Sequence, residues 1–378
     1  MRIIILGTSW PYRGGLASFN ERLAQQFMSE GNEVELFTFT LQYPSFIFPG
    51  KTQYSDDPQP KDLKITRSLS SVNPFSWSKT AQQIAQLRPD LLVIKFWQPM
   101  MAPCLGAVAR KVKKLTNNAT KVVSILDNVI PHEHHFWDRF LIKYFIKSVD
   151  HFVAMSDSVK KDCERFSTKK QQVALCPHPL YDNFGELIPK PTAREKLGLE
   201  KDTLYYLFFG FIRDYKGLDL LMHAFADERL KQKNVRLLVA GEFYNNAEQY
   251  ARLEEKLGLK GRIFWHTHFI PNEDVKYYFS ACDLVVQPYK SATQSGVTQV
   301  AYHFNKPMLV TNVGGLAEIV PDQKVGYVTR VMPKDIADAL LDFCEKGDVE
   351  CFQSGILEEK KKYTWSNMTQ TICNLQLI

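Results

Sequence analysis

Arg213 and Lys216 stand three residues apart in the segment GFIRDYKGLDLLMHAF, which begins at Gly210. A strand-like apolar run, YYLFFGF, leads into this segment, and an amphipathic helix pattern follows it. Arginine offers a planar fork to phosphate oxygens, and lysine offers a point charge. Because α/β proteins hold phosphates at strand-to-helix turns, the pair predicts a phosphate site. A solvated pair of surface cations before a helix is the alternative.

Two further turns of this kind follow in the same half of the chain. Residues 293–296, Thr-Gln-Ser-Gly, come after the apolar run DLVVQPY and before a helix pattern. Small hydroxyl residues and a glycine there can present backbone N–H groups to a diphosphate, although ordinary N-capping by Ser295 is the alternative. The run PMLVT then leads into residues 312–315, Asn-Val-Gly-Gly, which form another such turn.

The segment GTSWPYRGG, from Gly7 to Gly15, joins the first apolar run to the first helix pattern. Gly14 and Gly15 allow the backbone to approach a ligand, and the helix N-terminus after them favours an anion. A plain tight turn is the alternative. The spacing is not GxGxxG and no acid closes the second strand, so a dinucleotide site and an NAD-dependent enzyme are disfavoured.

Bulk properties set wide limits. A chain of 378 residues is too long for one core and predicts two domains. The net charge of +6 fits an anionic ligand or a membrane surface, and it equally fits a bland basic surface. Seven scattered cysteines without a CxxC pair favour reduced thiols in a cytoplasmic chain. No apolar run is long enough to span a bilayer, and MRIIILG is too short for a signal peptide.

Apolar runs alternate with helix patterns along both halves of the chain, which predicts an α/β fold with strands buried on both faces. A proline-rich stretch at 177–200 interrupts the pattern and is interpreted as a linker followed by a helix. We therefore expect Rossmann-like domains at 1–180 and 181–361 and a terminal helix at 362–378. The strand-like runs are RIIILG, NEVELFTF, PDLLVIKF, TKVVSILD, DHFVAM, QVALCP, LYYLFFGF, VRLLVAGE, RIFWHTHF, DLVVQPY, PMLVT and VGYVT.

In combination, these motifs resemble those of retaining GT-B glycosyltransferases of family 4, the group 1 glycosyl transferases. The resemblance covers nearly the whole chain. It implies two Rossmann-like domains that face each other across a cleft, with a terminal helix that crosses back to the N-terminal domain. The motifs that carry it are the Gly14-Gly15 turn, GFIRDYKGLDLL, ACDLVVQPY, SGV with AYHFNKPMLVT, and VGGLAEIV.

The resemblance implies that the C-terminal domain binds a nucleotide-sugar donor and the N-terminal domain an acceptor. Arg213 and Lys216 would hold the donor diphosphate without a metal or other cofactor, and Asp127 would take the place of a histidine near the sugar. The other implied donor-binding residues are Gly14, Gly15, Phe269, Gln294, Ser295, Gly296, Val297 and Glu318. The implied acceptor-side residues are Phe96, Trp97, His132 and Glu133, with a solvated loop as the alternative for His132 and structural packing for Phe96 and Trp97.

The chain departs from the family pattern at several positions. Ala292 and Val300 occupy the places of two glutamates, whose role would pass to Gln294, Thr298 or Gln299 together with backbone groups. The usual arginine directly after the glycine is replaced by Phe211. Asp56-Asp57 is interpreted as solvated surface and not as a metal signature. A zinc site in His132-Glu133-His134-His135 is disfavoured because adjacent side chains point in different directions.

An aromatic and basic segment, FWDRFLIKYFIKSVDHF, begins at Phe136. Such a helix can lie on an anionic bilayer, whereas a core-facing helix with solvated lysines is the simpler interpretation. His266 and His268 alternate along a strand-like run and are interpreted as a packed or edge-exposed pair.

The leading hypothesis is a metal-independent retaining glycosyltransferase of surface polysaccharide synthesis, which transfers a sugar to a glycan or lipid-linked acceptor. It would act in the cytoplasm, with peripheral attachment to the inner face of the membrane as a further option, and without a nucleic-acid partner. Same-face attack through an oxocarbenium-like state, with the leaving phosphate as base, is the mechanism the resemblance implies. The alternatives are a non-catalytic nucleotide-sugar-binding or scaffold protein of the same fold, and a sugar-nucleotide epimerase.

Overall fold

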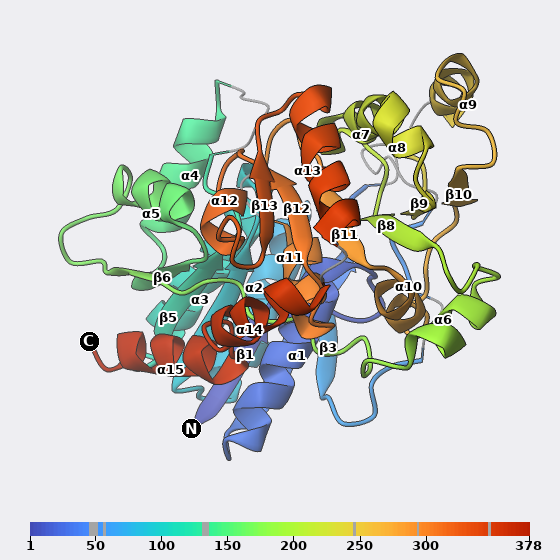
Figure 1. Ribbon diagram of the computed structural model, residues 1–378. Coiled ribbons are helices and arrows are strands. Elements are labelled where there is room, and N and C mark those ends of the chain that lie inside the picture. Colours follow the sequence, from blue (N-terminus) through green and yellow to red (C-terminus); the bar gives the residue numbers. More distant parts are fainter. Residues whose placement is uncertain (45–51, 56–57, 131–135, 245–246, 293–294, 347–348) are drawn as a thin grey trace. The chain divides into compact units, whose positions relative to one another are not determined.

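A computed structural model describes residues 1–44, 52–55, 58–130, 136–244, 247–292, 295–346 and 349–378. The chain divides into two compact units (Figure 1). The amino-terminal unit comprises Met1–His178 together with Thr364–Ile378, and the carboxyl-terminal unit comprises Pro179–Tyr363.

The amino-terminal unit is built on a parallel sheet with the strand order β3-β2-β1-β4-β5-β6-β7. The order reverses between β1 and β4, which is the position where doubly wound sheets bind ligands beyond their carboxyl strand ends. The strands are β1 Arg2–Leu6, β2 Glu33–Leu41, β3 Ile65–Ser70, β4 Leu91–Phe96, β5 Lys121–Leu126, β6 His151–Ala154 and β7 Val173–Leu175.

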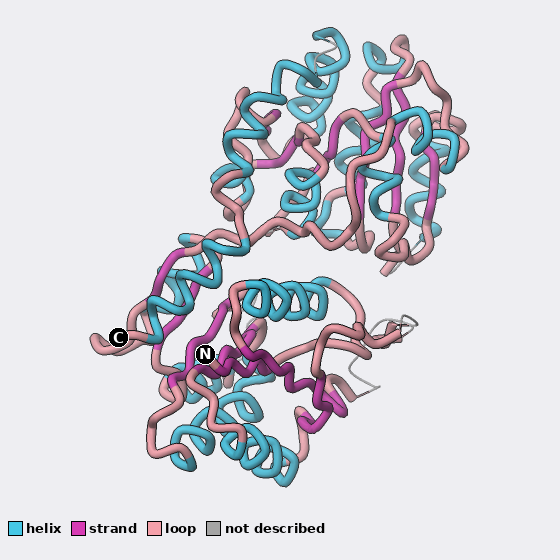
Figure 2. The backbone as a smooth tube through the Cα atoms, turned by 90° about the horizontal axis from the view of Figure 1, so that it is seen from below, coloured by secondary structure: helices cyan, strands magenta, loops and turns pink. Residues whose placement is uncertain are grey.

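Helices cover both faces of this sheet, as Figure 2 shows in cyan and magenta near the N label. Alternate residues of a strand point to opposite faces, so Ile4 and Leu6 pack with α2, α3 and α4 while Ile3 and Ile5 pack with α1 and α15. This two-sided burial explains the unbroken apolar runs of the strands. The helices are α1 Gly15–Ser29, α2 Pro74–Gln86, the 3₁₀ turn η1 Pro99–Met101, α3 Ala102–Leu115, α4 Asp138–Ile146, α5 Asp157–Glu164 and α15 Trp365–Gln376.

The terminal helix α15 belongs to the amino-terminal unit, as the sequence predicted. Thr364 caps its N-terminus by accepting a hydrogen bond from the backbone N–H of Asn367. Trp365 lies 5.1 Å from Phe19 of α1, measured between ring centroids, and Met368, Ile372 and Leu375 are buried in the same core. The chain thus returns from the carboxyl-terminal unit to complete the core of the amino-terminal one.

The carboxyl-terminal unit contains a second parallel sheet, with the order β10-β9-β8-β11-β12-β13. The order reverses here between β8 and β11, so the ends of these two strands frame the expected ligand position. The strands are β8 Leu204–Phe209, β9 Val235–Ala240, β10 Ile263–His266, β11 Leu284–Gln287, β12 Met308–Thr311 and β13 Gly326–Thr329. The helices are α6 Lys190–Lys196, the 3₁₀ turn η2 Asp214–Lys216, α7 Leu218–Phe225, α8 Glu228–Lys231, α9 Ala247–Lys256, α10 Val275–Ala281, α11 Gly296–His303, α12 Leu316–Ile319, α13 Pro333–Lys346 and α14 Val349–Lys360.

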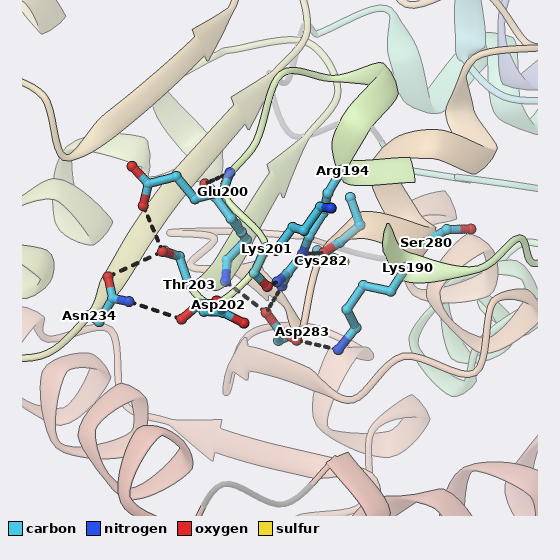
Figure 3. Close-up of polar contacts among 12 residues, drawn as sticks. Lys190, Arg194, Glu200, Lys201, Asp202, Thr203, Asn234, Ser280, Cys282 and Asp283 are labelled. Atoms are coloured by element: carbon cyan, nitrogen blue, oxygen red, sulfur yellow. Dashed lines mark hydrogen bonds and ion pairs between the residues drawn. The ribbon is translucent and has the colours of Figure 1, made fainter. Parts of the chain in front are cut away.

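A buried carboxylate ties α6 to the second sheet. Asp283, just before β11, accepts hydrogen bonds from Lys190 Nζ at 2.6 Å and from Arg194 Nη2 at 2.8 Å (Figure 3). The same carboxylate accepts a bond from the backbone N–H of Tyr205 in β8 at 2.8 Å. Arg194 also donates through Nε to the carbonyl oxygen of Ala281. The first helix after the linker is therefore fixed to two central strands by one charged cluster.

Candidate functional site

The loop after β8 holds the two cations that the sequence singled out. Gly210 has a φ of +99°, which places it in the left-handed region that glycine enters without strain. Arg213 then begins a single 3₁₀ turn, Asp214–Lys216, and Gly217 with a φ of +69° starts α7. A Cβ atom on Gly217 would lie 2.0 Å from the carbonyl oxygen of Pro288, so glycine is required for this close approach to the loop after β11.

Lys216 points back toward the end of β8, the strand that leads into this loop. Its Nζ atom lies 2.9 Å from the position that a Cβ atom on Gly210 would occupy, and 5.7 Å from the ring centroid of Tyr289. Burial, together with the charge of Arg213, lowers the pKa of Lys216 to about 8. The ammonium group is thus held in a cramped, partly dehydrated place beside the strand-order reversal.

Arg213 is fixed by stacking. Its guanidinium carbon lies 3.9 Å from the ring centroid of Tyr244, which follows β9. Its Nε atom is buried and makes no hydrogen bond to any part of the chain that the structure describes. A buried N–H donor without a partner is costly, and a bound anion would supply the missing acceptor.

A third cation nearby, Lys290, behaves differently. Its Nζ atom makes ion pairs with Asp214 at 2.8 Å and with Asp219 at 3.0 Å, so its charge is already compensated. Neither Arg213 nor Lys216 has an acidic partner among the described residues. The loop therefore keeps two positive charges available at one spot and neutralises the third.

The N-terminus of α11 supplies the second turn that the sequence predicted. The Ser295 hydroxyl accepts a hydrogen bond from the backbone N–H of Val297, so Ser295 is the N-cap, and it also contacts the Tyr289 hydroxyl at 3.2 Å. A Cβ atom on Gly296 would come within 2.9 Å of the Tyr181 ring. The hydrogen bond between Tyr289 and Ser295 joins this cap to the ring beside Lys216. Gln294 lies outside the described residues.

Two further predicted donor residues, Glu318 and Phe269, follow strands of the second sheet. Glu318 is exposed on α12, after β12, and has no ion pair within the described part of the chain. Phe269 is exposed after the edge strand β10. His266 Nδ1 lies 3.0 Å from the Tyr278 hydroxyl, and its ring stacks on His268, which supports the packing interpretation of that pair.

The two positions that replace family glutamates are structural. Val300 is buried in α11, and Ala292 packs against the same core. Gln299, beside Val300, is completely buried, and neither side-chain amide atom has a hydrogen-bond partner among the described residues. Within the part of the chain that the structure describes, a glutamine amide therefore lies buried and unsatisfied beside the position of a family glutamate.

In the amino-terminal unit, the turn from Gly7 to Gly15 is ordered by a carboxylate. Glu21 Oε1 accepts hydrogen bonds from the Ser9 hydroxyl at 2.9 Å and from the Trp10 backbone N–H at 2.7 Å. Gly14, with a φ of +101°, precedes the first turn of α1, which contains no acidic residue. The helix N-terminus after this loop carries the partial positive charge of the α1 dipole, and an anion site there stays a prediction.

The strand-order reversal of this unit contains a residue that sequence reasoning missed. Lys95, in β4, is almost completely buried, and its Nζ atom lies 2.8 Å from Asp127 Oδ1 and 3.4 Å from the ring centroid of Phe19. Burial lowers the pKa of Lys95, while the charge of Asp127 acts in the opposite direction. Asp127 itself is half-buried directly after β5. The signal that could have revealed Lys95 is its position as the one charged residue in the otherwise apolar run LLVIKF.

This pair gives a testable stability prediction. Asp127→Asn leaves a buried ammonium without its counter-charge, so we expect a loss of about 3 kcal/mol at neutral pH. Adding Lys95→Met to this variant should recover most of the lost stability. A double-mutant cycle, with the free energy of unfolding measured in urea, tests this recovery. In Asp127→Asn, Lys95 binds its proton more tightly in the unfolded chain than in the folded one. The stability lost by this variant should therefore shrink as the pH rises toward about 10. Equal losses in the single and double variants would contradict this account.

The predicted acceptor-side residues do not share one environment. Phe96 was expected to line that side, but it is a core residue: it is 1% exposed and stacks on Phe145 at a centroid distance of 4.2 Å. Trp97 is half-buried and donates a hydrogen bond from Nε1 to the Tyr43 hydroxyl at 2.8 Å. His132 and Glu133 lie outside the described residues, as do Asp56, Asp57, His134 and His135.

The described residues contain neither a metal-ligand cluster nor a membrane-spanning helix. They contain no cluster of three or more histidine, cysteine, aspartate or glutamate residues arranged to hold a metal ion. None of the described helices is both long and apolar enough to cross a membrane.

Two family models match this chain. The model described as Glycosyl transferases group 1 matches residues 189–352, and the model described as Glycosyltransferase Family 4 matches residues 13–181. Together they cover most of the chain, one on each unit. The chain belongs to the group 1 glycosyltransferases.

Individual relatives agree with this assignment, and a solved structure agrees with the fold. A D-inositol 3-phosphate glycosyltransferase from Nocardioides sp. is 27% identical over 59% of this chain, which spans about half (52%) of that relative. A lipopolysaccharide 1,2-N-acetylglucosaminetransferase from Salmonella typhimurium is 26% identical over 52% of this chain and 54% of its own length. The solved structure of HepE from Anabaena, in complex with UDP, superposes with a TM-score of 0.73 at 15% identity and covers 99% of both chains. That likeness shows the fold, two Rossmann-like domains of the GT-B class.

Proposed function

We propose that the protein is a retaining, metal-independent glycosyltransferase that uses a nucleoside-diphosphate sugar. It would transfer the sugar to a hydroxyl of a glycan or lipid-linked acceptor in surface polysaccharide synthesis. The observation that carries the proposal is the pair of cations at the reversal of the second sheet. Arg213 and Lys216 lack acidic partners among the described residues, whereas the neighbouring Lys290 has two.

The chemistry follows from charge. As the bond between the sugar and the diphosphate breaks, negative charge grows on the leaving phosphate. Preorganised cations in a partly dehydrated place stabilise that charge more than they stabilise the ground state. Arg213 provides a fork held flat by Tyr244, and Lys216 provides a point charge beside Tyr289. Two such cations can neutralise a diphosphate, which supports a reaction that needs no metal.

In the amino-terminal unit we assign acceptor binding to the sheet edge that carries Asp127. Lys95 occupies Oδ1 of this carboxylate, so Oδ2 is the oxygen that can accept a hydrogen bond from a sugar hydroxyl. Retention would follow from attack on the face that the diphosphate leaves, with a phosphate oxygen as the base.

The lipopolysaccharide-modifying relative supports a surface glycan as the acceptor class. The free cysteines among the described residues support a cytoplasmic location, which we propose to be the inner face of the membrane.

The test is donor cleavage by the purified chain. UDP-glucose, UDP-galactose, UDP-N-acetylglucosamine, GDP-mannose and ADP-glucose are each incubated with it, and release of nucleoside diphosphate is measured with and without EDTA. We expect release from one base class, unchanged by EDTA, with slow hydrolysis in the absence of acceptor. Binding without any release would instead favour the non-catalytic alternative. The observation behind that alternative is Val300, which is buried at a position where the family has a glutamate. Conversion of one sugar nucleotide into another would favour the epimerase.

A further inference from the structure

Helices α2, α3 and α4 form one layer on one face of the amino-terminal sheet. Their buried side chains belong to a single core together with Ile4 and Leu6 of β1, and α3 packs against both of its neighbours. Each helix follows a strand of a parallel sheet, α2 after β3, α3 after β4 and α4 after β5. The amino ends of the three helices therefore lie at the carboxyl edge of the sheet, the edge that carries Asp127.

The outer surface of this layer is cationic. The three helices contain seven basic residues and one acid, Asp138, which is buried. Their net charge equals the +6 of the whole chain. Several of these cations are exposed and have no acidic partner among the described residues; with Lys147, which directly follows α4, they are Lys79, Lys114, Arg139, Lys143 and Lys147.

Large apolar side chains stand exposed at the amino ends of the same helices. Phe75 at the start of α2 is 87% exposed, and Phe136 just before α4 is 90% exposed. Phe140 in α4 is 72% exposed; Val72, just before α2, and Met100, in the 3₁₀ turn η1 before α3, are exposed as well. Aromatic rings left in water are unfavourable in isolation, and a group of them indicates a surface that is covered in use.

On α4 the two features combine into a stripe. Phe140 and Lys143 of α4 and Lys147 at its C-cap follow one another at intervals of three and four residues, so they share one face of the helix; the stripe also includes the exposed Phe136, which lies just before α4. From Phe140 to Lys147 the stripe is about 10 Å long at the rise of an α-helix. The opposite face, which includes Ile142, Phe145 and Ile146, is already buried in the core. The exposed stripe is therefore additional to the face that folding requires.

We propose that the surface of α2, α3 and α4 docks on an anionic lipid bilayer. The rings of Phe75, Phe136 and Phe140 would enter the boundary between headgroups and acyl chains, and the exposed cations would pair with lipid phosphates. The combination of rings with unpaired cations favours a bilayer over an acidic protein, because a bilayer edge offers both apolar and anionic contacts over a broad plane. The inference rests on the proposed function, because a bilayer is where a lipid-linked acceptor lies.

The experiment measures binding of the full chain to vesicles by co-sedimentation. Vesicles of phosphatidylcholine alone are compared with vesicles containing about one third of phosphatidylglycerol. We expect binding to the anionic vesicles only, weakened at least tenfold when the ionic strength is raised to about 0.5 M. Equal binding to both kinds of vesicle, or to neither, would overturn the proposal.

Two variants test the surface separately. Arg139→Glu/Lys143→Glu/Lys147→Glu reverses the charge of the stripe, and Phe136→Ser/Phe140→Ser removes its rings. Each is expected to reduce binding at least tenfold without lowering the melting temperature, because every changed side chain is exposed. The matched control, Arg252→Glu/Lys256→Glu/Lys260→Glu on and beyond α9, makes the same charge change elsewhere and should bind like the wild type. If the charge variant loses vesicle binding and the ring variant keeps it, the rings do not enter the bilayer. The surface would then be assigned to a soluble polyanion.

Failure of this inference is distinguishable from failure of the proposed function. Donor cleavage is measured without vesicles in the same variants, where it should equal that of the wild type. Cleavage without vesicle binding overturns the docking surface alone. Vesicle binding without cleavage of any donor overturns the transferase and leaves the docking surface supported.

Discussion

Lys216→Ala is expected to weaken binding of the matching nucleoside diphosphate by about 30- to 160-fold, because a charge-assisted contact to phosphate contributes about 2–3 kcal/mol. The donor-cleavage rate should fall further, by about 10²- to 10³-fold, because the charge on the leaving phosphate grows in the transition state. Arg213→Ala should act in the same direction. Thermal-shift titration with UDP, GDP and ADP measures the binding loss, since a ligand of the folded state raises the melting temperature.

The control for this experiment is Lys334→Ala. Lys334 is exposed in the same unit and pairs with Asp338, so its removal takes away the same charge without touching the β8 loop. It should leave both the nucleotide-induced shift and cleavage unchanged. If Lys216→Ala also retains both, the diphosphate lies elsewhere and the assignment of the cations is wrong.

The pH dependence of binding provides an independent check on Lys216. Its pKa of about 8 means that the ammonium group loses its proton in the mildly alkaline range. Only the protonated form attracts a diphosphate, so the nucleotide dissociation constant should be flat near pH 7 and rise above pH 8. Lys216→Ala, already weak, should lack this rise. A wild-type dissociation constant that stays flat to pH 10 would contradict the lowered pKa or the contact.

Local patterns in the sequence were sufficient for the sheets and for the cation pair. The twelve strand-like runs named from the sequence all became strands, because strands buried on both faces carry unbroken apolar runs. The strand that was missed, β3 Ile65–Ser70, lies at the sheet edge and mixes exposed and buried residues. Its sequence therefore lacks the signal on which the other strands were recognised.

The residues around the cations could not be predicted in the same way. Tyr244 and Tyr289 reach Arg213 and Lys216 only because β9 and β11 are the neighbours of β8, and strand order is not written in any local pattern. The partner of Lys95, Asp127, likewise comes from the adjacent strand. Long-range neighbours of this kind follow from topology alone.

The error at Phe96 has a simple geometric cause. Side chains alternate between the two faces of a strand, and Phe96 shares the face of Leu92 and Ile94, which is covered by α2, α3 and α4. Its place at the end of a strand suggested a ligand contact, but the parity of its position directs it into the core. Trp97, one residue later, is half-buried and packs against the margin of the same core.

The largest stability effect is expected at Asp283, where one buried carboxylate holds two cations and a backbone N–H. Asp283→Ala leaves Arg194, whose side chain is 5% exposed, without a counter-charge, and leaves the Tyr205 N–H without an acceptor. Loss of one partner from such a buried pair costs about 3–5 kcal/mol, because the remaining ion stays desolvated. Asp283→Asn should recover part of this loss, since an amide oxygen can still accept a hydrogen bond.

Asp338 is a matched control because it also holds two cations, Arg229 at 2.6 Å and Lys334 at 2.8 Å, but at 40% exposure. Water solvates the partners when this carboxylate is removed, so Asp338→Ala should cost about 1 kcal/mol or less. Hydrogen exchange in β8 and β11 measures both variants within the intact chain and isolates the unit concerned. Similar losses for Asp283→Ala and Asp338→Ala would show that burial does not set the cost. A large loss at Asp283 alone would show that the ion cluster fixes α6 to the sheet whose strand ends carry Arg213 and Lys216.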